Sequence, residues 1–293
     1  MKVKVTIGVC VRDGAQSLPQ AIESIIRQDY PHKFLEVIFV DDGSQDETLD
    51  ILKKYATKMD MQVRIFHHEW KGLGPSRNVV VDNATGDYIV WVDADMILPE
   101  DHVSRQVEFM EKNPKAGIAK ARYRLSCNGN LVALLEDITC IIDDFKIKHH
   151  NLKLPGTGGS IYRTNVIRQV GGFDNNLTGV GEDQDAAYRI KESGWLIKTS
   201  DAYFYEAREH SWSALWRKYF WYGFGHYFLY LKNKLIFKPY KMIPLAGFFA
   251  GLLYSFSAYR LIKRQAVFLL PLHFVLKSTA WTLGFISGFL KSV

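Results

Sequence analysis

The sequence predicts an α/β domain with a mostly parallel sheet, followed by helices that associate with a membrane. Two observations predict the α/β domain: short β-branched runs alternate with segments of helical periodicity, and acidic residues directly follow several of these runs. Alternation of this kind predicts a parallel sheet with crossover helices. The second part depends on composition, because charged residues thin out after Met242 while Leu, Phe, Ala and Gly take over.

The expected elements follow one another in a regular order. Strands are expected at residues 3–11, 35–40, 63–67 and 88–92, and helices at 18–28, 46–58 and 76–84. The helix at 18–28, for example, carries Leu18, Ile22 and Ile25 at helical spacing. Later in the chain we expect a helix at 136–148, a strand at 157–162 after a Gly-rich turn, a helix at 182–192, and strands at 195–199 and 202–205.

Two apolar segments near the C-terminus, 242–259 and 266–290, approach the roughly 20 residues that a membrane-spanning helix needs. His273 and Lys277 interrupt the second segment, so that helix is expected to tilt, to lie partly at the interface, or to turn Lys277 towards protein. The aromatic and basic segment 212–230 suits a helix at headgroup level. The predicted domains are a catalytic domain at 1–210, amphipathic interfacial helices at 211–240 and a transmembrane hairpin at 241–293.

The net charge of +6 does not indicate a nucleic-acid partner, because no basic run interleaved with stacking aromatics precedes the aromatic segment. Basic residues gather instead beside the apolar segments, where anionic lipid is the better partner. The three cysteines are scattered, which excludes a disulfide framework and fits a reducing compartment. No apolar signal segment precedes the first strand. We therefore expect a protein of the cell membrane with its catalytic domain in the cytoplasm.

Carboxylates are expected to meet at one edge of the predicted sheet. Asp13, Asp41 with Asp42, and Asp93 with Asp95 follow three different strands. Ligands of parallel sheets bind outside the carboxyl ends of the strands, where the loops diverge. Three strands that deliver carboxylates to this edge therefore predict a binding site.

A set of motifs in this sequence resembles the family 2 glycosyltransferases, whose GT-A fold is a Rossmann-like sheet domain. The motifs are, in order, Asp41-Asp42-Gly43-Ser44, Gly72-Leu73-Gly74-Pro75-Ser76-Arg77-Asn78, Asp93-Ala94-Asp95, and Gly171-Gly172-Phe173-Asp174 followed by Gly181-Glu182-Asp183-Gln184-Asp185. Each motif alone is weak, but the ordered set is specific and covers about residues 3–225. The members with a C-terminal membrane anchor, including the polyprenyl-phosphate sugar transferases and a reduced form of the cellulose-synthase arrangement, are the most similar in organisation.

The sequence departs from this family in two places. Val9-Cys10-Val11-Arg12-Asp13 stands where the family usually has a Pro-Thr-x-Asn turn, which makes the role of Asp13 less secure. The QxxRW signature of cellulose synthases is missing around Arg217, which favours transfer of a single sugar over processive synthesis.

The resemblance implies a nucleotide-sugar donor and a divalent metal, Mn²⁺ or Mg²⁺. Carboxylates hold such an ion, and the ion stabilises the charge that grows on the departing diphosphate. Asp95 is the first-choice ligand, Asp93 reaches the metal or the ribose, and His210 completes the metal or diphosphate site. The nucleotide-sugar site comprises Asp13, Asp41, Arg77 and Asp93. The alternatives are a solvated turn for the aspartates, a surface position for Arg77 and an interfacial histidine for His210.

Inversion at the anomeric carbon needs a base that removes the proton of the acceptor hydroxyl. Asp183 is the candidate base, and Glu182 stands beside it in the same catalytic segment. Both lie at a helix start, where the helix dipole favours the charged carboxylates while their neighbours oppose them. Asp185 is expected to cap this helix or to pair with Arg189 four residues on.

Two other functions use some of the same features. A nucleotidyltransferase also uses paired aspartates and a metal, but would carry a phosphate-binding Gly-rich loop after the first strand, where Arg12-Asp13-Gly14 stands instead. A non-catalytic membrane scaffold would be suggested by loss of Asp95 or Asp183, and both are present. The expected activity is transfer of a sugar, with GDP-mannose as one candidate donor, to a lipid-linked or membrane-proximal acceptor.

Overall fold

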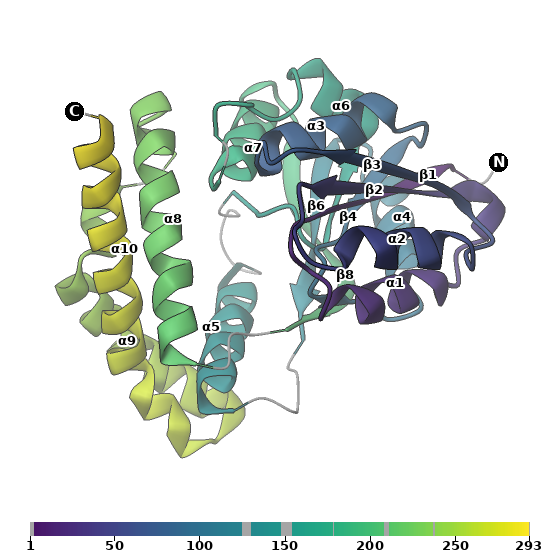
Figure 1. Ribbon diagram of the computed structural model, residues 1–293. Helices are drawn as coiled ribbons and strands as arrows, with labels where there is room; N and C mark the ends of the chain where they lie inside the picture. Colours follow the sequence, from purple (N-terminus) through teal and green to yellow (C-terminus); the bar gives the residue numbers. More distant parts are fainter. Residues whose placement is uncertain are drawn as a thin grey trace. The chain divides into compact units, whose positions relative to one another are not determined.

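The computed structural model describes residues 3–124, 130–147, 154–177, 179–207, 211–236 and 238–292. The chain divides into two compact units, and Figure 1 labels the helices and most of the strands. Unit 1 consists of Met1–Arg122, Asn151–Thr178 and Glu182–Ala207, and unit 2 of Tyr123–His150, Gly179–Gly181 and Arg208–Val293.

Unit 1 is built on an eight-stranded sheet with the order β3-β2-β1-β4-β7-β6-β8-β5. The strands are β1 (Val5–Val11), β2 (Leu35–Asp42), β3 (Gln62–His68), β4 (Tyr88–Trp91), β5 (Met96–Ile97), β6 (Ala116–Tyr123), β7 (Ser160–Arg163) and β8 (Leu196–Glu206). β3, β2, β1 and β4 run parallel, whereas β7 pairs antiparallel with β4 and β6, and β5 pairs antiparallel with β8. The α/β fold predicted from the sequence is confirmed.

Helices cover both faces of this sheet. They are α1 (Leu18–Ile26), α2 (Thr48–Ala56), α3 (Leu73–Asn83), α4 (His102–Lys112), α6 (Thr164–Gln169) and α7 (Glu182–Glu192), with a short 3-10 helix η1 (His32–Phe34). α3, α6 and α7 pack against one another on one face, and α1 and α2 lie together on the other (Figure 1). Every residue of β2 is consequently buried, which explains the apolar run from Val37 to Val40.

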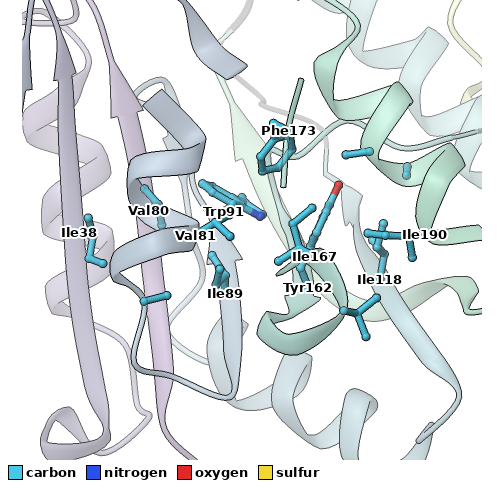
Figure 2. Close-up of a cluster of buried hydrophobic side chains, with 14 of the residues drawn as sticks. Ile38, Val80, Val81, Ile89, Trp91, Ile118, Tyr162, Ile167, Phe173 and Ile190 are labelled. Carbon is cyan, nitrogen blue, oxygen red and sulfur yellow. The ribbon is translucent and has the colours of Figure 1, made fainter. Parts of the chain in front are cut away.

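The core of unit 1 supports the end of β4. Trp91, the last residue of that strand, packs edge-on against Phe173 and Tyr162, at centroid distances of 5.5 and 6.3 Å (Figure 2). Aliphatic side chains from neighbouring elements, among them Val80 and Ile167, complete this buried cluster. Because Asp93 follows Trp91 by two residues, the cluster holds the strand end from which Asp93 emerges.

Several elements of unit 1 were not expected from the sequence, and β6 and α4 are the longest of them. β6 carries Lys120 and Arg122, whose cationic groups donate to backbone carbonyls inside unit 1. α4 turns His102 and Gln106 towards the core, where each binds a backbone carbonyl of another element. Polar residues with such partners occupy core positions in both segments, so hydrophobic periodicity did not reveal them.

Unit 2 is helical in the part of it that the structure describes. It contains α5 (Leu131–Ile147), α8 (Trp212–Lys232), α9 (Pro244–Ile262) and α10 (Leu270–Ser292), with 3-10 helices η2 (Pro239–Met242) and η3 (Gln265–Leu269). α10 packs along both α8 and α9 (Figure 1). Two segments, Pro244–Ile262 and Gln265–Ser292, are long and apolar enough to cross a membrane by the measure of length and composition.

Candidate active site

The carboxyl ends of the parallel strands bring the predicted carboxylates to one edge of unit 1. β1 and β2 are in parallel register with Val11 opposite Asp41, so the turn that contains Asp13 follows β1 at the level where β2 ends. β4 lies on the other side of β1 and leads to Asp93. The strand ends that carry the predicted carboxylates therefore lie at one edge of the sheet, the edge at which ligands of parallel sheets bind.

Asp41 is fully buried at the end of β2. Its Oδ1 accepts hydrogen bonds from the backbone N–H of Ser44, at 3.2 Å, and from the Ser44 hydroxyl. Its Oδ2 lies 2.7 Å from Nδ1 of His67, which stands opposite Asp41 in the register of β2 and β3. The carboxylate of Asp41 thus orders the loop after β2, and His67 is a site residue that sequence reasoning missed because periodicity does not give strand register.

Asp42 orders a second loop. It accepts hydrogen bonds from the backbone N–H groups of Lys71 and Gly72, at 2.8 and 2.9 Å, directly before α3. Gly72 has φ of 95°, a left-handed conformation that glycine adopts without strain. His68 lies 3.4 Å from Asp42, in the same way that His67 lies beside Asp41. The two aspartates thereby fix the Gly-rich segment that leads to Arg77.

Asp13 connects the first two strand ends. Its backbone N–H donates to the Ser44 hydroxyl at 2.9 Å, and its Oδ1 accepts from the backbone N–H of Gln45 at 2.7 Å. Asp13 has φ of 49°, which is rare for a residue other than glycine. Its side chain is 47% exposed, so one part of the carboxylate holds the loop while the other faces the surface of the site.

Arg77 is a buried cation that lies beside the carboxylates of Glu182 and Asp93. It is 5% exposed, forms a close ion pair with Glu182, and lies 4.0 Å from the carboxylate of Asp93. Its guanidinium also stands 5.8 Å from the ring centroid of Phe173. Burial opposes the charge of Arg77, but the neighbouring carboxylates, Glu182 first, raise its pKa, so Arg77 stays protonated.

Glu182 is as deeply buried as its partner. Burial raises the pKa of its carboxyl, against the stabilising charge of Arg77 and with the repulsion of Asp183. Its Oε2 has no hydrogen-bond partner among the described residues. Burial likewise raises the pKa of the nearby Cys10 thiol to about 12, which keeps it neutral. The pair of Arg77 and Glu182 therefore joins the Arg-Asn motif on α3 to the first turn of α7, where the catalytic residues are predicted.

Asp93 and Asp183 approach two different glycines of the same turn. A Cβ atom at Gly158 would lie 3.0 Å from Cγ of Asp93 and closer still to its Oδ2, and a Cβ at Gly156 would lie 3.2 Å from Oδ2 of Asp183. At Gly158 only a residue without a side chain lets the Asp93 carboxylate lie this close to the backbone, whereas at Gly156 the contact is merely tight. Lys120 of β6 donates to the carbonyl of Gly158, and this hydrogen bond fixes the turn. Sequence reasoning missed Lys120, since it stands in an unexpected strand.

Asp183 and Asp185 differ in their surroundings. Asp183, in the first turn of α7, is partly exposed and its Oδ1 accepts from the backbone N–H of Gln184 at 2.7 Å. Asp185 is 2% exposed and its Oδ2 lies 2.9 Å from Nε of Arg189, the pair that the spacing of four residues predicts. Asp183 is therefore the more accessible of the two carboxylates.

Asn78 links α3 to the acceptor-side motif. Its Oδ1 accepts from the backbone N–H of Phe173 and its Nδ2 donates to the carbonyl of the same residue, both at 2.8 Å. Gly172 has φ of 70°, and a Cβ there would collide with the Asn78 side chain. The Arg-Asn dipeptide thus uses both residues to bind the segment around Phe173 and Glu182, a role the sequence did not reveal for Asn78.

The structure describes two of the three predicted metal ligands, Asp93 and Asp95. The side chain of Asp93 is 48% exposed, and the backbone carbonyl of Asp95 accepts from Ala207 at 2.8 Å. Within the described ranges, no cluster of three or more His, Cys, Asp and Glu side chains is arranged to hold a metal. His210 lies outside the described residues, three positions after Ala207. The pair supplies hard oxygen donors, which suit Mg²⁺ or Mn²⁺ when phosphate and water provide the remaining ligands.

A sheet edge that combines carboxylates, a buried arginine and glycine turns is typical of α/β enzymes that bind phosphorylated ligands. The sequence profile described as Glycosyl transferase family 2 matches residues 6–171, more than half of the chain. The chain belongs to glycosyl transferase family 2.

Two curated relatives match shorter stretches. The poly(ribitol-phosphate) beta-N-acetylglucosaminyltransferase TarS of Staphylococcus aureus (strain Mu50 / ATCC 700699) is 28% identical over 111 residues, which are 38% of this chain and 19% of TarS. The cholesterol galactosyltransferase of Borreliella burgdorferi is 35% identical over 94 residues, which are 32% of this chain and 25% of that protein. The chain thus spans a quarter or less of the length of either relative.

One solved structure resembles the whole chain. The mannosyltransferase PcManGT from Pyrobaculum calidifontis, determined in complex with GDP-Man and Mn²⁺, has a TM-score of 0.70 and 18% sequence identity. The likeness covers 100% of this chain and 89% of that chain. It confirms the predicted GT-A fold.

Proposed function

We propose that the chain is a membrane-associated, metal-dependent glycosyltransferase that moves one sugar from a nucleotide-diphosphate sugar to an acceptor, with inversion at the anomeric carbon. The observation that carries the proposal is the turn at Gly156 and Gly158, which Asp93 of the donor side and Asp183 of the acceptor side both approach. Membership of glycosyl transferase family 2 supports sugar transfer over nucleotidyl transfer.

The nucleotide is assigned to the loops after β1 and β2. Asp13 and Asp41 hold these loops in place through Ser44 and Gln45, which gives the site a fixed shape before the ligand arrives. Asp41 would accept from N–H or hydroxyl groups of the base and ribose. Arg77, charged and buried 4.0 Å from Asp93, would stabilise the negative charge of the diphosphate.

The divalent ion is assigned to Asp93 and Asp95, with His210 as a further ligand. When bound, such an ion polarises phosphate oxygens and stabilises the charge that develops on the leaving nucleoside diphosphate. The chain's own contribution is to hold the two carboxylates. Trp91 and the core around it fix the strand end, and Gly158 lets the carboxylate of Asp93 lie against the turn.

Asp183 is assigned as the general base. It takes the proton of the acceptor hydroxyl, while the acceptor oxygen forms a bond to the anomeric carbon. The bond between that carbon and the diphosphate oxygen breaks, and the nucleoside diphosphate leaves with the electron pair. Glu182, held by Arg77, fixes the first turn of α7 and thereby the position of Asp183.

The acceptor is proposed to be lipid-linked or to lie at the membrane surface. Support comes from the two apolar segments of unit 2, which would keep residues 1–210 near a membrane. GDP-mannose is the proposed donor, since it is the ligand of the mannosyltransferase whose fold covers this whole chain. The catalytic domain would face the cytoplasm, where nucleotide sugars are supplied.

Calorimetry with GDP and UDP tests the donor site. We expect the diphosphate to bind in Mn²⁺ or Mg²⁺, and binding to be lost in chelator and in Asp95→Ala, because the ion joins protein and phosphate. Asp50→Ala is the matched control, since Asp50 is a carboxylate 86% exposed on α2, and it should bind like wild type. Equal affinity in chelator and in Mn²⁺ would exclude the metal, and no binding of either nucleotide would favour a non-catalytic scaffold.

A further inference from the structure

In α9 and α10 of unit 2, small residues are buried and large apolar side chains are exposed, which is the reverse of the pattern in a soluble protein. On α9 the buried stripe consists of small residues, and the large apolar side chains point outwards. The buried positions are Gly247, Gly251, Ser255 and Ala258, and the exposed ones include Leu245, Phe249, Leu253 and Phe256. α10 repeats this pattern with Gly284 and Gly288 against α8. Close helix contacts through small residues with large apolar residues outside are typical of helices in lipid.

Lys277, the charged residue in the middle of α10, forms an ion pair inside unit 2. Lys277 is 8% exposed and its Nζ lies 2.6 Å from Oε1 of Glu136 on α5, and His273 lies 3.0 Å from the same oxygen. Burial disfavours the charged carboxyl, but Lys277 and His273 hold the pKa of Glu136 below its usual range. Between Leu270 and Leu290, α10 therefore exposes no charged side chain, although Lys277 lies within this stretch.

The turn between α9 and α10 is packed against α5. Leu135, Ile138 and Ile142 of α5 form a buried cluster with Ala258 at the end of α9 and with Val267 and Leu270 at the turn. α5 lies between β6 and β7 in the chain, so both of its ends continue into unit 1. The first residue of α8, Trp212, packs against His273 near the start of α10, and only five residues separate α8 from β8.

These short connections decide on which side of a membrane the turn can lie. The seven residues between β6 and α5 reach at most about 28 Å when fully extended, and the five between β8 and α8 reach less. Crossing a bilayer with its headgroups takes about 40 Å. Neither connection can therefore carry α5 or the start of α8 across a membrane from unit 1.

We propose that the α9–α10 hairpin enters the membrane with its turn on the same side as unit 1, where α5 holds it, and with the outer faces of α9 and α10 in lipid. A simple hairpin anchor would instead place its turn on the far side. Arg260, Lys263 and Arg264 at this turn would face anionic headgroups on the side of unit 1, in keeping with their charge. The proposal rests on the membrane association put forward under the proposed function.

Single-cysteine labelling of the full chain tests this topology. The three native cysteines are replaced, and a membrane-impermeant maleimide is applied to sealed vesicles of either orientation. Asp50→Cys on exposed α2 reports the side of unit 1. We expect Arg264→Cys at the turn to be labelled in the same vesicle orientation as Asp50→Cys. Labelling of Arg264→Cys only in the opposite orientation would overturn the proposal.

A third variant separates this proposal from the membrane association itself. Phe256→Cys replaces a side chain that is 64% exposed on the outer face of α9. Lipid should protect it, so that labelling is lost in both vesicle orientations and restored by detergent. If Phe256→Cys is labelled in intact vesicles, α9 is not in lipid, and both the proposal and the membrane association fail. Protection of Phe256→Cys with the turn on the far side would refute the topology alone.

Discussion

Replacing Gly158 by alanine would act directly on the carboxylate of Asp93. The added Cβ would lie 3.0 Å from Cγ of Asp93 and closer to Oδ2, and 3.2 Å from the sulfur of Met96. Asp93 is 48% exposed and can yield by rotating away, so the fold should survive while the carboxylate moves by about 1 Å. Misplacing a metal ligand in this way should weaken binding of the diphosphate in Mn²⁺ by roughly 10–100-fold.

Gly156→Ala is the matched control, because its Cβ would meet Asp183 instead, at 3.2 Å. That contact is relieved by a shift of a few tenths of an ångström, and Asp183 lies on the acceptor side of the site. Calorimetry should therefore find the diphosphate affinity preserved in Gly156→Ala and reduced in Gly158→Ala. If Gly158→Ala binds like wild type while Gly156→Ala does not, the assignment of Asp93 to the donor side is wrong.

Three further variants test the stability of unit 1, measured by hydrogen exchange of the β4 amides in the full chain. Arg77→Met should destabilise unit 1 by about 3–5 kcal/mol, since it leaves the charge of Glu182 buried without a partner, and a change below 1 kcal/mol would mean that the pair is not buried in solution. Burial lowers the pKa of His102 to about 4 in the folded protein, from its usual value of about 6.5. As the pH falls below about 6.5, His102 therefore binds a proton in the unfolded chain but not yet in the folded protein, which lowers the free energy of unfolding. Wild type should therefore lose about 2 kcal/mol between pH 7 and pH 5 that His102→Gln does not lose, and equal slopes would contradict this. Asp185→Asn should cost about 1 kcal/mol through its pair with Arg189 and leave donor binding intact, and loss of binding in a folded variant would reassign Asp185.

The strands and helices that carry the site could be predicted because they follow simple periodicities. The buried apolar runs of β1, β2 and β4 end in aspartates, and the ends of parallel strands necessarily share an edge. Asp41 could be placed at this edge from the sequence alone. That His67 also contacts this carboxylate could not be predicted, because the contact depends on the register of β2 with β3.

The contacts that join distant motifs could not be predicted from the sequence, for a different reason. Arg77 and Glu182 are 105 positions apart, and nothing local in either segment marks the other as its partner. Lys120 carries no signal in the sequence, since only the fold reveals that the carbonyl of Gly158 accepts from it. In the same way Lys277 could be expected to face protein, but its partner Glu136 on α5 is a product of tertiary packing.

The most direct test of the account compares sugar transfer with donor binding in Asp183→Asn. The amide is nearly isosteric with the carboxylate, so the fold and the metal-dependent affinity for the donor should match wild type. Transfer of labelled mannose from GDP-mannose into a membrane lipid extract should fall by about 100-fold or more, the scale of losing a positioned general base. Transfer at the wild-type rate by the folded Asp183→Asn protein would contradict the assignment of Asp183, and with it the proposed mechanism.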